Sequence, residues 1–313
     1  MTGPIARLGD ASADPAVLGG KGASLQRLAA AGFDVPPGFC VTAEAFRAHL
    51  AAPDRATRAA AAAARLPEDA ARRELVALVT DEPLPLELRV ALDAAIAQLV
   101  RTLGSTSGEV DLRFAVRSSG LAEDSAGASF AGAHDTELGV RADGIEAALR
   151  RCWASLWGER AIAYRLRRGV ALEGDAMAVV VQALVPADMA AVVFTRHPVT
   201  GRTDQLLVNA VRGLGEALVS GAVTPDSIVI DKATRAMVEY VPGERGERLV
   251  AAMDGGVVAV ADADQGPVLD AAALAALVDL CLRVEREFGA PIDIEAAAAA
   301  GRWYLLQARP ITA

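Results

Sequence analysis

Short apolar segments separated by turn residues fill the second half of the chain, and they constrain its fold more than any other feature. Prolines and glycines such as Pro198, Gly201 and Pro225 lie between these segments. Segments of this kind are typical of short buried strands. The first half differs, because residues 51–101 are rich in alanine and charge at helical spacing. The predicted strand segments are 177–185, 190–195, 205–211 and 226–231.

This contrast predicts an α/β protein of the α+β kind, built from two lobes. A chain of 313 residues can hold two lobes or one large unit with a cleft. We expect the first lobe to cover residues 1–175 and the second to cover residues 176–313. A long helix over about 270–288 and a final pair of strands complete the second lobe.

The composition narrows the classes of function. The net charge of −9 argues against general nucleic-acid binding. The apolar fraction is 53%, yet no run of about 18 apolar residues predicts a membrane span. The N-terminal segment has no apolar signal-peptide core. Three cysteines lie far apart without metal-ligand spacing, so we expect reduced thiols in a cytoplasmic protein.

A glycine-rich bend, Gly19-Gly20-Lys21-Gly22, precedes a segment of helical pattern that ends before Gly32. Glycines allow backbone amides to approach phosphate oxygens, and the start of a helix favours anions. Lys21 would add a mobile positive charge there. Taken alone, the bend is better explained as an ordinary loop, because its spacing does not match a P-loop.

Arg117 ends a predicted strand that begins at Phe114, and a loop of small residues follows from Ser118 to Thr136. An arginine in this position can bind phosphate oxygens in a fork, and a glycine-rich loop can close over a triphosphate. The alternative is a surface loop beside a structural salt bridge. Long loops without structure of their own are uncommon unless they are functional or disordered.

Four polar residues near the C-terminus form the sharpest group of candidate site residues. Asp293 and Glu295 are two residues apart, so in a strand their side chains point to the same face. Gln307 and Arg309 repeat that spacing on what we predict to be the next strand of a hairpin. Carboxylate and amide oxygens beside an arginine suit Mg²⁺ that bridges nucleotide phosphates. The alternative is a cross-strand salt bridge on a solvated face.

A weaker signal is Gly213-Leu214-Gly215-Glu216, which follows a predicted strand. It could contact phosphate or ribose. The default interpretation is a turn followed by the start of a helix.

Read in order, these segments resemble the N-terminal ATP-binding domain of the phosphoenolpyruvate synthase, pyruvate phosphate dikinase and rifampin phosphotransferase family. The resemblance covers nearly the whole chain, except for residues near 50–110 and 235–280, which match no block in detail. The four matching blocks are GGKGASLQRLAAAGFDVPPGFCVT, FAVRSSGLAEDSAGASFAGAHDTELGV, VVVQALVPADMAAVVFTRHPVTGRTDQLLVNAVRGLGEALVSGAVTPD and PIDIEAAAAAGRWYLLQARPIT.

The resemblance implies an ATP-grasp-like fold whose two lobes enclose a nucleotide cleft that holds Mg·ATP. By motif position it assigns Lys21, Arg117 and Arg309 to the phosphates, under a loop that includes Gly132 and Thr136. The hinge strand beside adenine would consist of Gln182, Ala183, Leu184 and Val185, with Glu216 near the ribose. Glu295 and Gln307 would hold Mg²⁺, and Asp293 would support them.

Enzymes of this family transfer the β-phosphoryl group of ATP to a histidine on a swivelling domain, and ATP ends as AMP and phosphate. The three histidines of this chain, at 49, 134 and 197, do not match the family's phosphohistidine context. We therefore expect a dikinase-type phosphotransferase that is incomplete alone. Its partners would be a histidine-bearing swivelling domain and an acceptor-binding domain, supplied in cis or in trans. These residues do not identify the final acceptor of the phosphoryl group.

Two alternatives remain at this stage. A self-sufficient ATP-grasp kinase or ligase would act on a small acceptor and release ADP. A non-catalytic nucleotide-binding protein would keep only the fold. The retention of Lys21, Arg117, Glu295, Gln307 and Arg309 argues against the second alternative.

Overall fold

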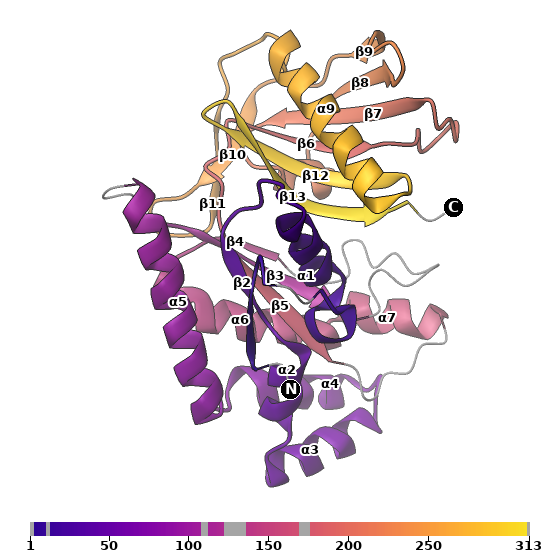
Figure 1. Cartoon of the computed structure of the whole chain (residues 1–313). Coiled ribbons are helices and arrows are strands. Elements are labelled where there is room, and N and C mark those ends of the chain that lie inside the picture. The colour runs from indigo at the N-terminus through magenta and orange to yellow at the C-terminus, as the bar shows by residue number, and fades with distance from the viewer. Residues whose placement is uncertain (1–2, 11–12, 108–111, 122–135, 169–175, 312–313) are drawn as a thin grey trace. The chain divides into compact units, whose positions relative to one another are not determined.

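The computed structural model of the chain describes residues 3–10, 13–107, 112–121, 136–168 and 176–311, and the chain divides into two compact units (Figure 1). Unit 1 comprises residues 1–26 and 37–184, and unit 2 comprises residues 27–36 and 185–313. The predicted boundary after residue 175 falls before strand β5, Met177–Ala183, which belongs to unit 1.

Unit 1 is built on a five-stranded sheet in which every neighbouring pair of strands is antiparallel. The two central strands, β5 and β3, consist mostly of small and β-branched residues, and β3 is buried along its whole length. β5 is almost wholly apolar, whereas β3 buries Arg117, Ser118 and Ser119 among its small residues. In spatial order the strands are β1 (Ile5–Arg7), β2 (Gly38–Val41), β5 (Met177–Ala183), β3 (Phe114–Gly120) and β4 (Thr136–Val140).

The helices of unit 1 pack around a small group of aromatic residues. Phe46 contacts Trp153 edge to face with ring centroids 5.5 Å apart, and it also contacts Trp157. The indole N–H of Trp153 donates to the carbonyl of Met177 at 3.1 Å, which fastens helix α6 to the sheet. The predicted N-cap Thr42 is confirmed, since its side chain accepts from the Ala45 amide. The helices are α1 (Pro15–Ala30, shared with unit 2), α2 (Ala43–Leu50), α3 (Pro53–Ala63), α4 (Asp69–Thr80), α5 (Leu86–Ser107), α6 (Ile145–Ala154) and α7 (Glu159–Arg168), with 3-10 turns at Ala142–Gly144 and Ser155–Trp157.

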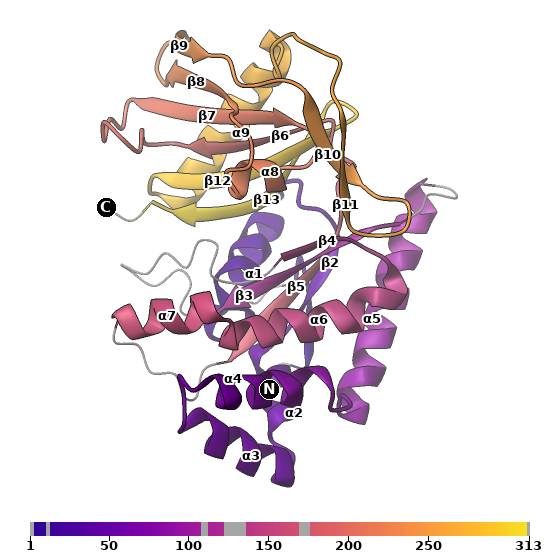
Figure 2. The same ribbon diagram turned by 180° about the vertical axis from the view of Figure 1, so that it is seen from behind.

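Unit 2 is built on a six-stranded sheet, also antiparallel between neighbours. The predicted strands of this unit and the helix near 270–288 are confirmed, whereas β9, β10 and β11 were not predicted. Figure 2 shows β10 and β11 as a separate hairpin. In spatial order the sheet contains β13 (Arg302–Pro310), β12 (Ile292–Ala299), β6 (Met189–Phe194), β7 (Gln205–Arg212), β8 (Asp226–Asp231) and β9 (Met237–Val241). The other elements are α8 (Glu216–Val219), β10 (Glu247–Ala251), β11 (Val257–Ala261) and α9 (Ala271–Phe288).

Helix α9 covers one face of this sheet and creates the core of unit 2 (Figure 1). It begins at the N-cap Asp270, whose side chain accepts from the Ala273 amide, and ends at Gly289 in the left-handed conformation. Its buried side chains, including Leu277 and Val284, meet alternate residues of the strands such as Ile294. Each such side chain contributes about 1.5–3 kcal/mol when it is fully buried. Because strand side chains alternate, the remaining residues of β12 point to the opposite face. In β13 a register irregularity, opposite Glu295 and Ala296, shifts this alternation, so that Leu305 and Ala308 both reach the core.

Among the residues that the structure describes, no helix is both long enough and apolar enough to cross a lipid bilayer.

A buried histidine lies in the helical part of unit 1. His49 lies at the end of α2, where its Nε2 contacts the Leu78 carbonyl at 3.2 Å and its Nδ1 contacts the Arg55 guanidinium at 3.0 Å. These partners require a neutral ring that donates from Nε2 and accepts at Nδ1. Burial, followed by the charge of Arg55, lowers the pKa of His49 from 6.5 to about 4.

We expect stability to fall as the pH falls from 6.5 towards 4, because only the unfolded chain takes up the proton of His49 over that range. The loss is at most about 3 kcal/mol. It is measured as the free energy of unfolding in urea at successive pH values. His49→Gln should reduce the change in the free energy of unfolding with pH. His197→Gln, which lies outside the buried helical core, should leave that change as it is in wild type. Equal slopes in all three proteins would contradict the assignment.

Candidate nucleotide site

The glycine-rich bend lies inside α1, where Gly19 leaves the helical conformation with φ of 68° and ψ of 173°. Residues from Gly20 onward are helical again, so Lys21 stands in the first turn of the second helical segment. A side-chain hydroxyl from a distant strand holds this bend. The Gly22 amide donates to Ser119 Oγ at 3.0 Å, and that hydroxyl donates to the Leu18 carbonyl at 2.7 Å.

Arg117 lies in the middle of β3, so the prediction that the strand ends there is wrong. The strand continues through Gly120 because its last three residues pair with β5, a partner that the local sequence does not reveal. Arg117 and Ser119 are two residues apart and therefore share one face of the sheet. Ser119 contacts the bend on that face, so the structure brings the strand of Arg117 and the bend of Lys21 together within unit 1.

Two predicted loop residues have different outcomes. Thr136 begins β4, is exposed, and lies directly opposite Arg117 in the register of β3 and β4. Gly132 lies outside the residues that the structure describes. The role of both residues over the phosphates stays a prediction.

The predicted hinge strand is the end of β5 and the crossing from unit 1 to unit 2. Ala183 and Leu184 donate backbone hydrogen bonds to Pro37 and Arg113, at 2.8 and 2.9 Å. Gln182 is buried, and its amide nitrogen has no hydrogen-bond partner among the described residues. A buried amide without a partner costs about 1–3 kcal/mol, which a ligand acceptor would recover. Val185, also buried, is the first residue of unit 2 in this segment.

The predicted hairpin near the C-terminus is confirmed, and its register brings all four polar residues to one face. Glu295 lies opposite Gln307, and Asp293 lies opposite Arg309. Arg309 donates from Nε and Nη2 to one oxygen of Asp293, at 2.8 and 2.7 Å. The neighbouring residues Ile294 and Ala308 point to the α9 core. The four polar residues therefore occupy the face of the sheet that α9 does not cover.

The charged side chains of this group influence one another. Burial raises the pKa of Asp293, and the negative charge of Glu295 raises it further, while Arg309 opposes both effects. Asp293 is thus subject to one opposite charge and one like charge at a largely buried position. A divalent cation bound by Glu295 and Gln307 would reduce the repulsion between the carboxylates.

Glu216 begins α8, a single helical turn that follows β7, as the default interpretation predicted. It is half-buried, and its Oε2 has no hydrogen-bond partner among the described residues. Burial raises the pKa of this carboxyl group. A hydroxyl donor from a ligand would satisfy the oxygen.

Sequence reasoning did not identify Ser119, although the pair Ser118-Ser119 follows Arg117 directly. Its importance depends on a contact with Gly22, which lies 97 residues away. Nothing in the local pattern indicates that contact.

Two antiparallel sheets that carry helices, with candidate polar groups on their faces, define an α+β protein of ATP-grasp-like fold. The chain belongs to the family described as "Pyruvate phosphate dikinase, AMP/ATP-binding domain", whose model matches residues 15–313. Membership supports an adenine nucleotide as the ligand.

Three curated relatives illustrate the range of proteins that the chain resembles. A probable phosphoenolpyruvate synthase of Methanocaldococcus jannaschii is 36% identical over 96% of this chain and 26% of its own length. The prodigiosin synthesizing transferase PigC of Serratia marcescens is 38% identical over 97% of this chain and 32% of its own length. The rifampicin phosphotransferase of Streptomyces sviceus is 38% identical over 95% of this chain and 34% of its own length. The chain therefore spans only about a third or less of these relatives.

The close packing of the bend on β3 can be tested by substitution of Gly19. A Cβ at Gly19 would lie 2.1 Å from the Ser119 carbonyl oxygen, and the residue has a positive φ of 68°. We expect Gly19→Ala to destabilise unit 1 by about 2–5 kcal/mol, through the left-handed backbone and the overlap together. Gly32→Ala is the matched control, since Gly32 has a φ of 78° and open space around it. It should cost about 1–2 kcal/mol. Urea unfolding measures both, and equal losses would contradict the packing of the bend on β3.

Proposed function

We propose that this chain binds Mg·ATP and transfers a phosphoryl group from it to a histidine carried by a separate domain or polypeptide. The single observation that carries the proposal is the register of β12 and β13, which aligns Glu295 with Gln307 and Asp293 with Arg309 on one face. Family membership supplies the nucleotide, and this polar group supplies the chemistry that a metal-bound triphosphate requires.

In this proposal Glu295 and Gln307 hold Mg²⁺. Mg²⁺ keeps several waters and is usually bound by one or two carboxylates together with substrate phosphates. A carboxylate and an amide oxygen on adjacent strands match this coordination preference. Among the described residues no group of three or more His, Cys, Asp or Glu side chains could form a protein-only cage, which agrees with a site that substrate oxygens complete. The ion would neutralise charge on the phosphate oxygens.

Lys21, Arg117 and Arg309 would bind the phosphates. A lysine contributes a mobile point charge, whereas an arginine fork fixes the direction of the phosphate oxygens. The Asp293 carboxylate would orient Arg309, since it receives both Nε and Nη2 of that side chain. Thr136, opposite Arg117, and Gly132 would contribute to the cover over the phosphates. Catalysis would consist of positioning and charge neutralisation.

The nucleoside would be bound by the end of β5 and by Glu216. Backbone groups from Gln182 to Val185 would lie beside adenine, and the buried Gln182 amide that lacks a described partner supports a ligand there. The Oε2 of Glu216, which also lacks a described partner, would accept from a ribose hydroxyl.

The properties of the chain's own histidines support a phosphoryl carrier outside this chain. His49 is fully buried, and the Nδ1 of His197 already faces the Val199 and Thr200 amides at 3.2 and 3.3 Å. His134 lies outside the described residues. A histidine-bearing swivelling domain and an acceptor-binding domain, in cis or in trans, would complete a dikinase-type cycle. In that cycle ATP, water and an acceptor become AMP, phosphate and the phosphorylated acceptor. The resemblance to relatives much longer than this chain agrees with this arrangement.

The test is a nucleotide product assay. The purified chain is incubated with Mg·ATP, with and without a separately expressed histidine domain from a relative, and the nucleotides are separated by chromatography. We expect AMP only when both components are present. Lys21→Ala and Arg117→Ala should each lower AMP formation by at least about 100-fold, because a phosphate-binding charge acts in the transition state. Circular dichroism should show that both variants still fold.

The nucleotide products separate the alternatives. ADP formed without the histidine domain would establish a self-sufficient kinase or ligase and reject the proposed transfer. Wild-type turnover in both Lys21→Ala and Arg117→Ala would reject the phosphate assignment.

The metal assignment is tested by Glu295→Gln, which keeps the shape of the side chain and removes its charge. We expect ATP affinity in the presence of Mg²⁺ to fall by about 10-fold or more, with little change in its absence. Calorimetric titration with and without Mg²⁺ measures this difference. The control is Glu239→Gln on the exposed strand β9, which should bind as wild type does. If Glu295→Gln kept the wild-type response to Mg²⁺, the metal role would be rejected.

A further inference from the structure

The hairpin of β10 and β11 is the part of unit 2 that the proposed function does not use. It belongs to the excursion between β9 and α9, and its strands form a separate two-stranded sheet. Two attachments hold it to the rest of unit 2. The first lies at the base of the excursion. The second joins β10 to the residues that follow β7.

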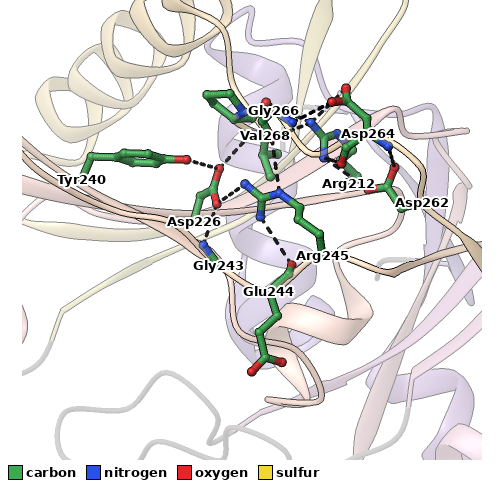
Figure 3. Close-up of polar contacts among 11 residues, drawn as sticks. Arg212, Asp226, Tyr240, Gly243, Glu244, Arg245, Asp262, Asp264, Gly266 and Val268 are labelled. Carbon is green, nitrogen blue, oxygen red and sulfur yellow. Dashed lines mark hydrogen bonds and ion pairs between the residues drawn. The ribbon is translucent and has the colours of Figure 1, made fainter.

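The first attachment is a buried carboxylate that receives four donors (Figure 3). Oδ1 of Asp226 accepts from the Gly243 amide at 2.8 Å and from Arg245 Nη2 at 2.6 Å. Its Oδ2 accepts from the Val268 amide at 2.8 Å and from the Tyr240 hydroxyl at 3.2 Å. Asp226 is fully buried at the start of β8. One side chain thus ties together the segments that leave β9 and enter α9.

Arg212, the last residue of β7, strengthens this base. Its Nη1 donates to the Asp264 carbonyl at 2.9 Å, and its Nη2 donates to the carbonyls of Gly266 and Pro267 at 2.9 and 3.0 Å. The return segment of the excursion is therefore fixed to the sheet at the same end as Asp226 (Figure 3).

The second attachment joins β10 to the segment that follows β7. The Leu214 amide donates to the Leu249 carbonyl at 2.9 Å, and Gly213 forms a parallel bridge with Leu249. Gly213 has a φ of 74°, and a Cβ there would lie 2.3 Å from the Leu249 oxygen. Glycine is therefore required both by the backbone conformation and by the closeness of β10.

Around this bridge the hairpin is not closely packed. A cavity of about 370 Å³ is lined by Val211 of β7, Ala217 of α8 and both strands of the hairpin, through residues such as Leu249 and Ala259. Since the cavity separates much of the hairpin from β7 and α8, the bridge to Leu249 is what links the hairpin to residues 213–216. The same backbone is also held beside the start of β6, where the Gly213 amide donates to the Asp188 carbonyl at 2.9 Å.

We propose that the β10–β11 hairpin is a positioning element for Glu216 and so sets the preference of this chain for ribonucleotides over 2′-deoxyribonucleotides. The hairpin acts through the Leu249 carbonyl, which accepts from the Leu214 amide, two residues before Glu216. When the hairpin places Glu216 correctly, its Oε2, which has no hydrogen-bond partner in the described part of the chain, accepts a hydrogen bond from the ribose 2′-hydroxyl. The inference rests on the proposed function, because it takes ATP as the ligand.

The test compares the affinities of Mg·ATP and Mg·2′-deoxy-ATP by calorimetry. A hydrogen bond to a charged group is worth roughly tenfold or more in affinity, so wild type should favour ATP by about that ratio. Glu216→Ala should bring the ratio close to one. Gly213→Ala should do the same by displacing β10, although Glu216 is intact. Gly201→Ala is the matched control, since Gly201 has a φ of 73° and open space around it, and it should keep the wild-type ratio.

A second variant keeps the test decisive if Gly213→Ala does not fold. Arg245→Gln releases the hairpin from Asp226, which retains three other donors, and it should reduce the ratio at least threefold. A wild-type ratio in folded Gly213→Ala, or in Arg245→Gln where Gly213→Ala fails to fold, would overturn the inference. So would loss of the ratio in Gly213→Ala with its retention in Glu216→Ala, or a wild type that binds both nucleotides equally. Failure of wild type to bind Mg·ATP would instead overturn the proposed function itself.

Discussion

The antiparallel register of β12 with β13 is the constraint on which the rest of unit 2 depends. Strand side chains alternate between faces, so the same register that sends Ile294 and Ala308 into the α9 core sends Glu295 and Gln307 to the other face. A shift by one residue would bury carboxylates and expose the core. Core formation and site assembly are therefore a single event, and the free energy of packing α9 also holds the candidate metal ligands in place.

In unit 1, hydrogen bonds of one side chain, and not a strand register, hold the candidate site residues in place. Its candidate phosphate-binding residues lie on a helix and on a strand that are far apart in the chain, and the hydroxyl of Ser119 joins the two elements. The bend at Gly19 approaches β3 so closely that no Cβ fits. Contact with the strand of Arg117 therefore fixes the backbone of the bend that carries Lys21. The flexible side chain of Lys21 extends from this fixed backbone.

Several parts of the fold could be predicted because their signals are local. Thr42 as an N-cap, the strands near 177–185 and 226–231, and the helix near 270–288 each follow from capping chemistry or periodicity. The strand at Phe114 was predicted too short, because its extension to Gly120 depends on pairing with β5. The exposed strand β9 and the hairpin β10–β11 escaped prediction, since half-exposed strands lack the apolar alternation on which such predictions depend.

By itself the sequence determined the residue types and spacings of the candidate site: two acidic residues two apart, Gln307 and Arg309 at the same spacing, and a lysine between glycines. Those spacings establish which side chains share a face, because periodicity is a local property of the backbone. Only the tertiary structure decided which faces meet, since the contacts of Ser119 with Gly22, of Asp226 with Arg245 and of Leu214 with Leu249 join segments through hydrogen bonds that leave no trace in local pattern. The sequence therefore limits the chemistry, and the long-range contacts set the positions from which it acts.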